Sequence, residues 1–265
     1  MYSPVQLAFK YVKYYLTASN GKGHGIHSPF VFDFITNVIN DSRHFYAYDS
    51  IEDCRQEIME NNKVLTIEDF GAGSTVTKSN ERKVKDIARS ALKPKKFGQL
   101  MFRMVNYFGS ATIAELGTSL GITTAYLASG NLTGNVFTFE GAKQVAEIAK
   151  QNFNDLALHN VCVIEGNFDD TLPQQLNKMR SVDFAFVDGN HRKEPTIRYF
   201  KQLLEKSTEF SVFIFDDIHW SEEMEEAWDY IQQHAAVKLT IDLFFIGIVF
   251  LRKEQKVPQH FVIRF

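Results

Sequence analysis

Residues 112–121 read TIAELGTSLG, and this stretch decides the fold of the chain. An apolar run ends on the first glycine, and a second glycine follows four residues later. A short helical segment, residues 122–129, comes next, followed by a Gly134-Asn135 turn and a second apolar run, residues 136–140. A strand, a glycine loop, a helix and a second strand that ends on an acid is the order in which parallel sheets build a cofactor site.

Five short apolar runs, each closed by Gly, Asp, Glu or Asn, indicate a parallel sheet. Buried parallel strands are near-continuous apolar runs, and each parallel pair needs a crossover long enough for a helix. Two apolar segments near the end of the chain predict a further strand pair. The sequence thus predicts a doubly wound, seven-stranded, mostly parallel α/β sheet, with its polar residues gathered at one edge. The expected strands are residues 112–117, 136–140, 161–167, 182–188, 212–217, 237–243 and 246–252.

Residues 1–95 differ in character from the rest of the chain and predict a helical N-terminal extension that caps the sheet. Residues 96–265 are predicted to form the sheet domain, because strands and helices alternate there. The expected helices of the extension are residues 4–15, 30–39 and 49–61. Those of the domain are residues 98–108, 123–128, 142–153, 172–179, 195–204 and 222–234.

The composition limits the partners of the chain, which has 265 residues, a net charge of −3 and 45% hydrophobic residues. This balance gives no general attraction to nucleic acid or membranes, and we expect neither as a partner. The longest apolar run, residues 243–251, is too short to span a bilayer, and the N-terminus lacks the order of a signal peptide. Cys54 and Cys162 suggest no disulfide framework, so a cytoplasmic location is expected. Cys162 is expected to be buried in its strand.

A second glycine-rich segment, residues 69–74 (DFGAGS), competes for the cofactor. No apolar strand follows it, so we interpret it as a structural turn or a flap over the substrate. The basic stretch that follows, residues 78–96, is typical of a solvated helix face or a loop. The alternative is a patch that attracts an anionic substrate.

The loop at residues 117–121 contains only Gly117 and Gly121 and lacks the G-x-G-x-x-G spacing that admits a dinucleotide pyrophosphate. Glu115 would repel a pyrophosphate but suits a ligand that carries an ammonium group. These features disfavour NAD and FAD. They favour S-adenosylmethionine, which has a zwitterionic amino acid tail and no phosphate. Glu140 ends the next strand, where an acid accepts hydrogen bonds from ribose hydroxyls.

Residues 97–253 resemble the class I S-adenosylmethionine-dependent methyltransferases, and among them the catechol and caffeoyl-CoA O-methyltransferase group. The resemblance begins in ELGTSLGITTA, residues 115–125, and implies a Rossmann-like fold. It implies that Ser119 and Thr123 contact the methionine part of the cofactor, and that Phe168 stacks beside the adenine. The cofactor-binding residues implied are Glu115, Gly117, Ser119, Gly121, Thr123, Glu140, Asn167, Phe168 and Asp188.

Two further motifs of the resemblance concern a metal ion: VDGNH at residues 187–191 and DDIHW at residues 216–220. They imply that Asp188, Asp216 and Asp217 bind Mg²⁺ or another divalent cation, since carboxylate oxygens suit hard ions. The chain has Asp217 where the group has Asn, and His191 where the group has a catalytic Lys. The resemblance thus implies His191 as general base, with Asp188 as the second catalytic residue.

The leading hypothesis is an O-methyltransferase that acts on a small hydroxylated, aromatic acceptor. The first alternative is a metal-independent N- or carboxyl-methyltransferase of the same fold. The second is a nucleotide-binding oxidoreductase or epimerase, which the missing third glycine and the lack of a Tyr-x-x-x-Lys pair disfavour. A module that binds the cofactor without methyl transfer is the third. A homodimer is compatible with each of them.

Several side chains keep two interpretations. His191 serves as a base, or it caps a helix or binds a carboxylate; His219 is expected to pair with a neighbouring carboxylate. Trp220 packs in the core or lines the acceptor pocket, and Asp242 is expected to be a turn residue. The aromatic side chains of residues 4–15 line an acceptor pocket, or pack on the sheet or on a second subunit.

Overall fold

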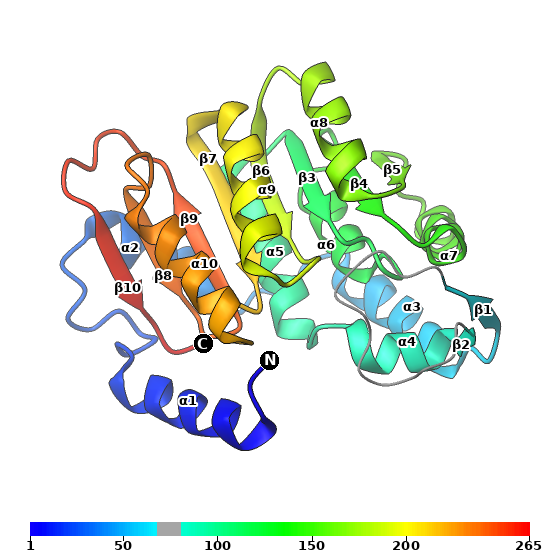
Figure 1. Ribbon diagram of the computed structural model, residues 1–265, viewed down its shortest axis with the longest axis horizontal. Coiled ribbons are helices and arrows are strands. Elements are labelled where there is room, and N and C mark those ends of the chain that lie inside the picture. The colour runs from blue at the N-terminus through cyan, green and yellow to red at the C-terminus, as the bar shows by residue number, and fades with distance from the viewer. Residues whose placement is uncertain (68–80) are drawn as a thin grey trace. The chain divides into compact units, whose positions relative to one another are not determined.

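The computed structural model in Figure 1 describes residues 1–67 and 81–265. The chain divides into two compact units, residues 1–41 with 180–265, and residues 42–179. The segment 69–74, predicted to be a turn or a flap, lies outside the described residues. The boundary predicted near residue 95 stays a prediction.

The predicted α/β sheet is confirmed, and it has eight strands instead of seven. In the unit of residues 42–179, three parallel strands follow one another: β3 (Thr112–Leu116), β4 (Asn135–Glu140) and β5 (Val161–Glu165). In the other unit the spatial order is β10 (Gln259–Val262), β8 (Leu239–Asp242), β9 (Ile246–Phe250), β7 (Ser207–Asp216) and β6 (Val182–Val187). There β9 is antiparallel to both neighbours, while β6 with β7 and β10 with β8 are parallel.

The additional strand β10 explains the error in the predicted strand count. Its four residues alternate between partly buried and exposed, so they form no continuous apolar run. It lies at the edge of the sheet, where it pairs in parallel with β8. A short edge strand with one solvated face carries little of the hydrophobic pattern that identified the other strands.

Cys162 corrects a second expectation, because its side chain is exposed and not buried. It lies on β5, which ends the strand order of the sheet. Burial along this strand is incomplete, whereas every residue of β9 is buried. The apolar run therefore marks a strand but does not tell whether that strand is central or at the edge.

Helices connect the strands in the unit of residues 42–179. Helix α5 ends at Gly109, whose φ of 62° is the left-handed conformation that closes many helices. The basic stretch holds a strand and an amphipathic helix, α4, with Val84, Ile87 and Ala88 buried. The elements are α3 (Tyr48–Glu60), β1 (Val64–Thr66), β2 (Glu81–Lys83), α4 (Val84–Ala91), α5 (Lys95–Phe108), α6 (Ile122–Gly130), α7 (Lys143–Asp155) and α8 (Phe168–Lys178).

The other unit joins the first helices of the chain to its last strands. Ser3 begins α1 with a capping box to Gln6, and Pro4 occupies the first helical position. In Figure 1, α9 and α10 lie side by side over the strands of this unit, and these two helices contact each other. The elements are α1 (Pro4–Thr17), α2 (Pro29–Phe34), the π-helix η1 (Ile35–Ile39), α9 (Lys193–Glu205) and α10 (Glu222–Gln233).

The core of this unit is aromatic. Phe184 and Phe186 of β6 and Phe213 and Phe215 of β7 are at most 1% exposed. Their burial on both faces of the sheet is what a parallel strand pair covered by helices requires. Across the described residues, each helix is too short or too polar to cross a membrane.

Candidate functional site

The glycine loop after β3 holds three residues in the left-handed region of backbone conformation. They are Gly117, Ser119 and Gly121, with φ of 104°, 48° and 85°. A side chain on Gly121 would also collide, because a Cβ there would lie 2.6 Å from Cε1 of Phe153. Both glycines are therefore required by the tight turn that leads into α6. Thr123 follows on the first turn of this helix, partly exposed.

Glu140 lies beside this loop, at the end of β4. Its Oε2 accepts a hydrogen bond from the backbone N–H of Ser119 at 2.8 Å, and its Oε1 accepts one from Ala142 at 2.9 Å. The carboxylate is partly exposed. The structure thus brings Gly117, Ser119 and Glu140 together, as the sequence predicted for a cofactor loop.

Glu115 is buried beneath the surface of the protein. Its side chain is fully buried and accepts hydrogen bonds from the hydroxyls of Thr124 and Thr138 through Oε2. Among the described residues, Oε1 makes no hydrogen bond. Burial raises the pKa of the Glu115 carboxyl to about 7, although the two hydroxyls oppose the shift. Glu115 therefore connects β3, β4 and α6 beneath the loop.

The turn after β5 is connected to the end of β4. The backbone N–H of Gly166 donates to the carbonyl of Glu140 at 2.9 Å. Asn167 begins α8, and its side chain accepts from the N–H of Asp169 at 3.0 Å. Phe168 is partly exposed in the first turn of that helix. Asn167 and Phe168, the residues predicted to lie beside the adenine, thus follow the end of β5. This strand pairs with β4, which ends on Glu140.

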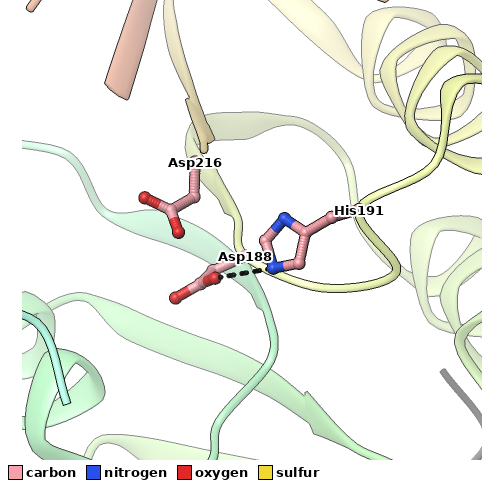
Figure 2. Close-up of side chains that lie close together, drawn as sticks. All are labelled: Asp188, His191 and Asp216. Carbon is pink, nitrogen blue, oxygen red and sulfur yellow. Dashed lines mark ion pairs between the residues drawn. The ribbon is translucent and has the colours of Figure 1, made fainter. Parts of the chain in front are cut away.

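In the other unit, Asp188, His191 and Asp216 form a cluster of possible metal ligands, shown in Figure 2. Asp188 follows β6, Asp216 is the last residue of β7, and His191 lies in the loop before α9. One ligand atom from each residue lies within 4.8 Å of the other two. Nε2 of His191 is 3.5 Å from Oδ1 of Asp188. The N-cap of α9 is Arg192 and not His191, so capping does not explain the histidine.

Asp217, the third predicted ligand, is not part of this cluster. Its φ of 51° ends the extended conformation of β7, and its N–H donates to the carbonyl of Phe245 at 2.7 Å. The residue lines a cavity of about 260 Å³ instead. Apart from Asp217 and His219, the wall of this cavity is apolar: Leu7, Ala8, Tyr11, Trp220, Phe244 and Phe245. Residues of α1 and Trp220 thus line a pocket, one of the two interpretations that the sequence left open for them.

His219 lies between two carboxylates, as expected for a structural partner. Its Nδ1 is 2.9 Å from Oε1 of Glu225, and its Nε2 is 2.7 Å from Oδ2 of Asp242. Burial lowers the pKa of His219, but the hydrogen bonds and charges of Asp242 and Glu225 outweigh it and hold the pKa above its usual value. Asp242 also has the turn role that was predicted, because its Oδ1 accepts from the N–H of Phe244 at 2.7 Å.

Glu225 is a residue that sequence reasoning missed. It accepts from the hydroxyl of Tyr2 at 2.7 Å and from Nζ of Lys10 at 2.9 Å, in addition to its contact with His219. Burial raises the pKa of Glu225, but hydrogen bonds from Lys10, Tyr2 and His219 lower it by more, so the pKa lies below its usual value. No motif connects Glu225 with Tyr2 and Lys10, since both lie 215 or more residues away from it in the sequence. The two lysines, Lys10 and Lys13, on an otherwise uncharged helix were the one available signal.

The chain carries a match to a known family, located at the residues described above. Residues 114–218 match the sequence profile of a family described as a methyltransferase domain. The matched segment begins in β3 and ends two residues beyond β7. It therefore includes the glycine loop, Glu140 and all three residues of the acidic cluster. No curated protein is significantly similar to the chain in sequence.

Solved structures share the fold. An O-methyltransferase from Bacillus cereus in complex with S-adenosylhomocysteine has a TM-score of 0.56 at 20% identity, over 83% of this chain and 97% of that one. The methyltransferase PaMTH1 from Podospora anserina, bound to S-adenosylhomocysteine, has a TM-score of 0.58 at 12% identity, over 85% and 97%. The O-methyltransferase TomG from Streptomyces achromogenes, in complex with S-adenosylmethionine, has a TM-score of 0.57 at 14% identity, over 79% and 91%. The resemblance to class I methyltransferases predicted from the sequence is confirmed, and the chain has their fold.

Proposed function

We propose that this chain transfers the methyl group of S-adenosylmethionine to a hydroxyl of a small aromatic acceptor, with a divalent cation at the acidic cluster. The observation that carries the proposal is the extent of the family match. Residues 114–218 contain, in one matched segment, both the loop suited to the cofactor and the acids suited to the ion. The O-methyltransferases among the structural neighbours agree in fold.

The proposed cofactor contacts come from the end of β3 and its neighbours. Gly117 and Gly121 keep the backbone open to a ligand, while Ser119 and Thr123 offer hydroxyls to its carboxylate or amine. Glu140 is oriented by two backbone N–H groups, and a carboxylate is the kind of acceptor that suits ribose hydroxyls. Preorganised acceptors of this kind lower the cost of ordering on binding.

The cluster fits a divalent cation by the chemistry of its donors. Asp188 and Asp216 offer carboxylate oxygens, and His191 offers a ring nitrogen, within 4.8 Å of one another. A bound divalent cation lowers the pKa of a hydroxyl at its surface and so favours the nucleophilic alkoxide or phenolate. Methyl transfer then converts the sulfonium into a neutral thioether and the hydroxyl into a methyl ether. The hydroxyl proton passes to a base, the role that the sequence resemblance gives to His191 when it does not bind the ion.

The acceptor pocket that we propose is the cavity next to Asp217. Tyr11, Trp220, Phe244 and Phe245 supply aromatic walls suited to a flat ring, and the volume of about 260 Å³ admits a small molecule. Both ring nitrogens of His219 already face carboxylates, and Asp217 offers the cavity a carboxylate that can accept from a hydroxyl. We place the enzyme in the cytoplasm, and a homodimer remains our expectation.

Two measurements test the proposal. Calorimetry with S-adenosylmethionine and with NAD should show binding of the first and none of the second; the opposite result would favour an oxidoreductase or epimerase. Labelled S-adenosylmethionine, Mg²⁺ or Mn²⁺, and a panel of catechols, phenols, anilines and benzoates should give methyl ethers alone. Methylation confined to amines or carboxylates, unaffected by a chelator, would replace the proposal with the metal-independent alternative.

A further inference from the structure

The cluster of Asp188, His191 and Asp216 differs from the ligand set that the resemblance implies. That set has three carboxylates, with Asp217 as the third, and leaves His191 as a base. We propose instead that His191 is the third protein ligand of the cation and that Asp217 is not a ligand. This inference rests on the proposed function only in that the cluster binds a divalent ion.

The spacing of the donors suits a shared ion better than a direct hydrogen bond. Nε2 of His191 and Oδ1 of Asp188 are 3.5 Å apart. A good N–H···O bond measures about 2.7–3.2 Å. Two donors that each lie about 2.1 Å from one ion stand about 3.0–3.4 Å apart, close to the 3.5 Å between these two atoms. Figure 2 shows that Asp216 and His191 come from two different segments, on either side of Asp188.

Burial supports the same assignment. Asp216 is 1% exposed, and Asp188 and His191 are partly exposed, so the cluster has one deep donor and two that face outward. A carboxylate at the depth of Asp216 is stabilised by positive charge, which a divalent ion supplies. Of the two cationic residues that follow His191, Arg192 and Lys193, the second is paired with Glu226 at 2.8 Å.

Asp217 is turned away from this arrangement by the backbone. Along an extended strand, consecutive side chains point to opposite faces. At Asp217 the strand ends in a left-handed residue, with φ of 51°, and its N–H is held by the carbonyl of Phe245 at 2.7 Å. The residue lines the apolar cavity instead. Adjacent acids in the sequence thus serve two different places.

An imidazole in the ligand set changes which ion the site prefers. Mg²⁺ favours oxygen ligands, whereas Mn²⁺ and Zn²⁺ accept two carboxylates and one imidazole. We therefore expect affinity to rise from Mg²⁺ to Mn²⁺ to Zn²⁺, more steeply than at an all-oxygen site. A ligating nitrogen cannot accept the acceptor's proton at the same time, so the base would be another group.

The experiment uses the full chain without a histidine tag, freed of metal by a chelator that is then removed. Electron paramagnetic resonance measures Mn²⁺ binding directly, and competition gives the affinity for Mg²⁺. His191→Ala should weaken Mn²⁺ binding at least tenfold. His191→Asp should retain binding but lower the preference for Mn²⁺ over Mg²⁺ at least tenfold. Asp217→Ala, the matched control next to Asp216, removes the side-chain oxygens at that position and should change Mn²⁺ affinity less than twofold.

Spin-echo spectra supply a second readout that depends on the bond itself. Bound Mn²⁺ should show coupling to a ¹⁴N nucleus in the parent protein and in Asp217→Ala, and none in His191→Asp. Absence of this coupling in the parent protein, unchanged Mn²⁺ affinity in His191→Ala, or loss of binding in Asp217→Ala would overturn the inference. S-adenosylmethionine is absent throughout, so failed cofactor binding would refute the proposed function while leaving this result intact.

Discussion

Glu140 offers the sharpest test of the glycine loop, because one carboxylate there holds two backbone N–H groups. We consider Glu140→Gln, which keeps the shape of the side chain and removes one of its two acceptor oxygens. Glutamine can accept from Ser119 or from Ala142, but its amide nitrogen must face the other N–H, donor against donor. The change thus breaks one bond and leaves a donor unpaired.

The magnitude follows from the kind of bond that is lost. A hydrogen bond to a charged group contributes about 1.5–3 kcal/mol, and the partial exposure of Glu140 favours the lower end. We therefore expect about 2 kcal/mol of lost stability, including the unpaired donor. For a chain of this size about 1 kcal/mol corresponds to about 2–4 °C, so the melting temperature should fall by about 4–8 °C. Affinity for S-adenosylmethionine should fall about tenfold, because about 1.4 kcal/mol of ribose contact is lost as well.

The assay is thermal unfolding without ligand, followed by calorimetry with S-adenosylmethionine. Glu165→Gln is the matched control, because Glu165 is the register partner of Glu140 on β5 and, among the described residues, its side chain forms a surface ion pair with Lys150 at 2.5 Å. Such pairs contribute about 0–1 kcal/mol. If Glu140→Gln melts within 1 °C of the parent protein, like the control, then the two hydrogen bonds do not hold the loop and our account of it is wrong.

Four further outcomes follow from the structure. Asp242 and Glu225 hold the pKa of His219 above its usual value in the folded state. This residue therefore stabilises the protein below about pH 6.5 and loses that effect as pH rises through the folded pKa. Urea unfolding from pH 5.5 to 8.5 should show a steeper decline in the free energy of unfolding in the parent protein than in His219→Gln. Glu115 is an acid, but its contribution to stability also falls as pH rises. Its pKa is about 7 in the folded protein, so its ionisation costs stability as pH rises from about 4.5 to 7. Glu115→Gln should therefore be more stable than the parent protein by up to about 3 kcal/mol at pH 8, and equally stable near pH 4. Gly121→Ala should lose about 1–3 kcal/mol in denaturant unfolding, because the new Cβ would meet Phe153 and the φ of 85° disfavours it; equal stability would mean that the loop relaxes freely. Tyr11→Ala should raise the KM for an aromatic acceptor severalfold and leave S-adenosylmethionine affinity within twofold; an unchanged KM would place the acceptor elsewhere.

The sequence was sufficient for most of the sheet, since continuous apolar runs identify buried parallel strands. The strands β6 and β7, buried along most of their length, are examples. It was insufficient for β10, whose alternating pattern resembles a polar tail, and for the exposure of Cys162, which depends on where β5 lies in the strand order. Edge position is a property of the whole sheet and leaves no local trace.

In the candidate site, too, residues with a local sequence pattern could be predicted, and residues placed by the fold could not. The glycine loop and Glu140 could be predicted because a tight turn and a strand-end acid have a local pattern. The direction of Asp217 could not, because one left-handed residue after a strand sends its side chain elsewhere. The contacts of Lys10 and Tyr2 with Glu225 depend on tertiary packing between distant segments, which no spacing in the sequence reports.

Glu225 gathers three donors from separate parts of the chain: Tyr2, Lys10 and His219. Because these three residues bind the same carboxylate, the four positions depend on one another. Natural variants should therefore change the four residues together and replace a single one of them less often. Directed evolution of acceptor choice faces the same constraint. A library that diversifies the inner face of α1 should keep Lys10 and vary Leu7, Ala8 and Tyr11, where side chains reach the cavity without bearing on the shared carboxylate.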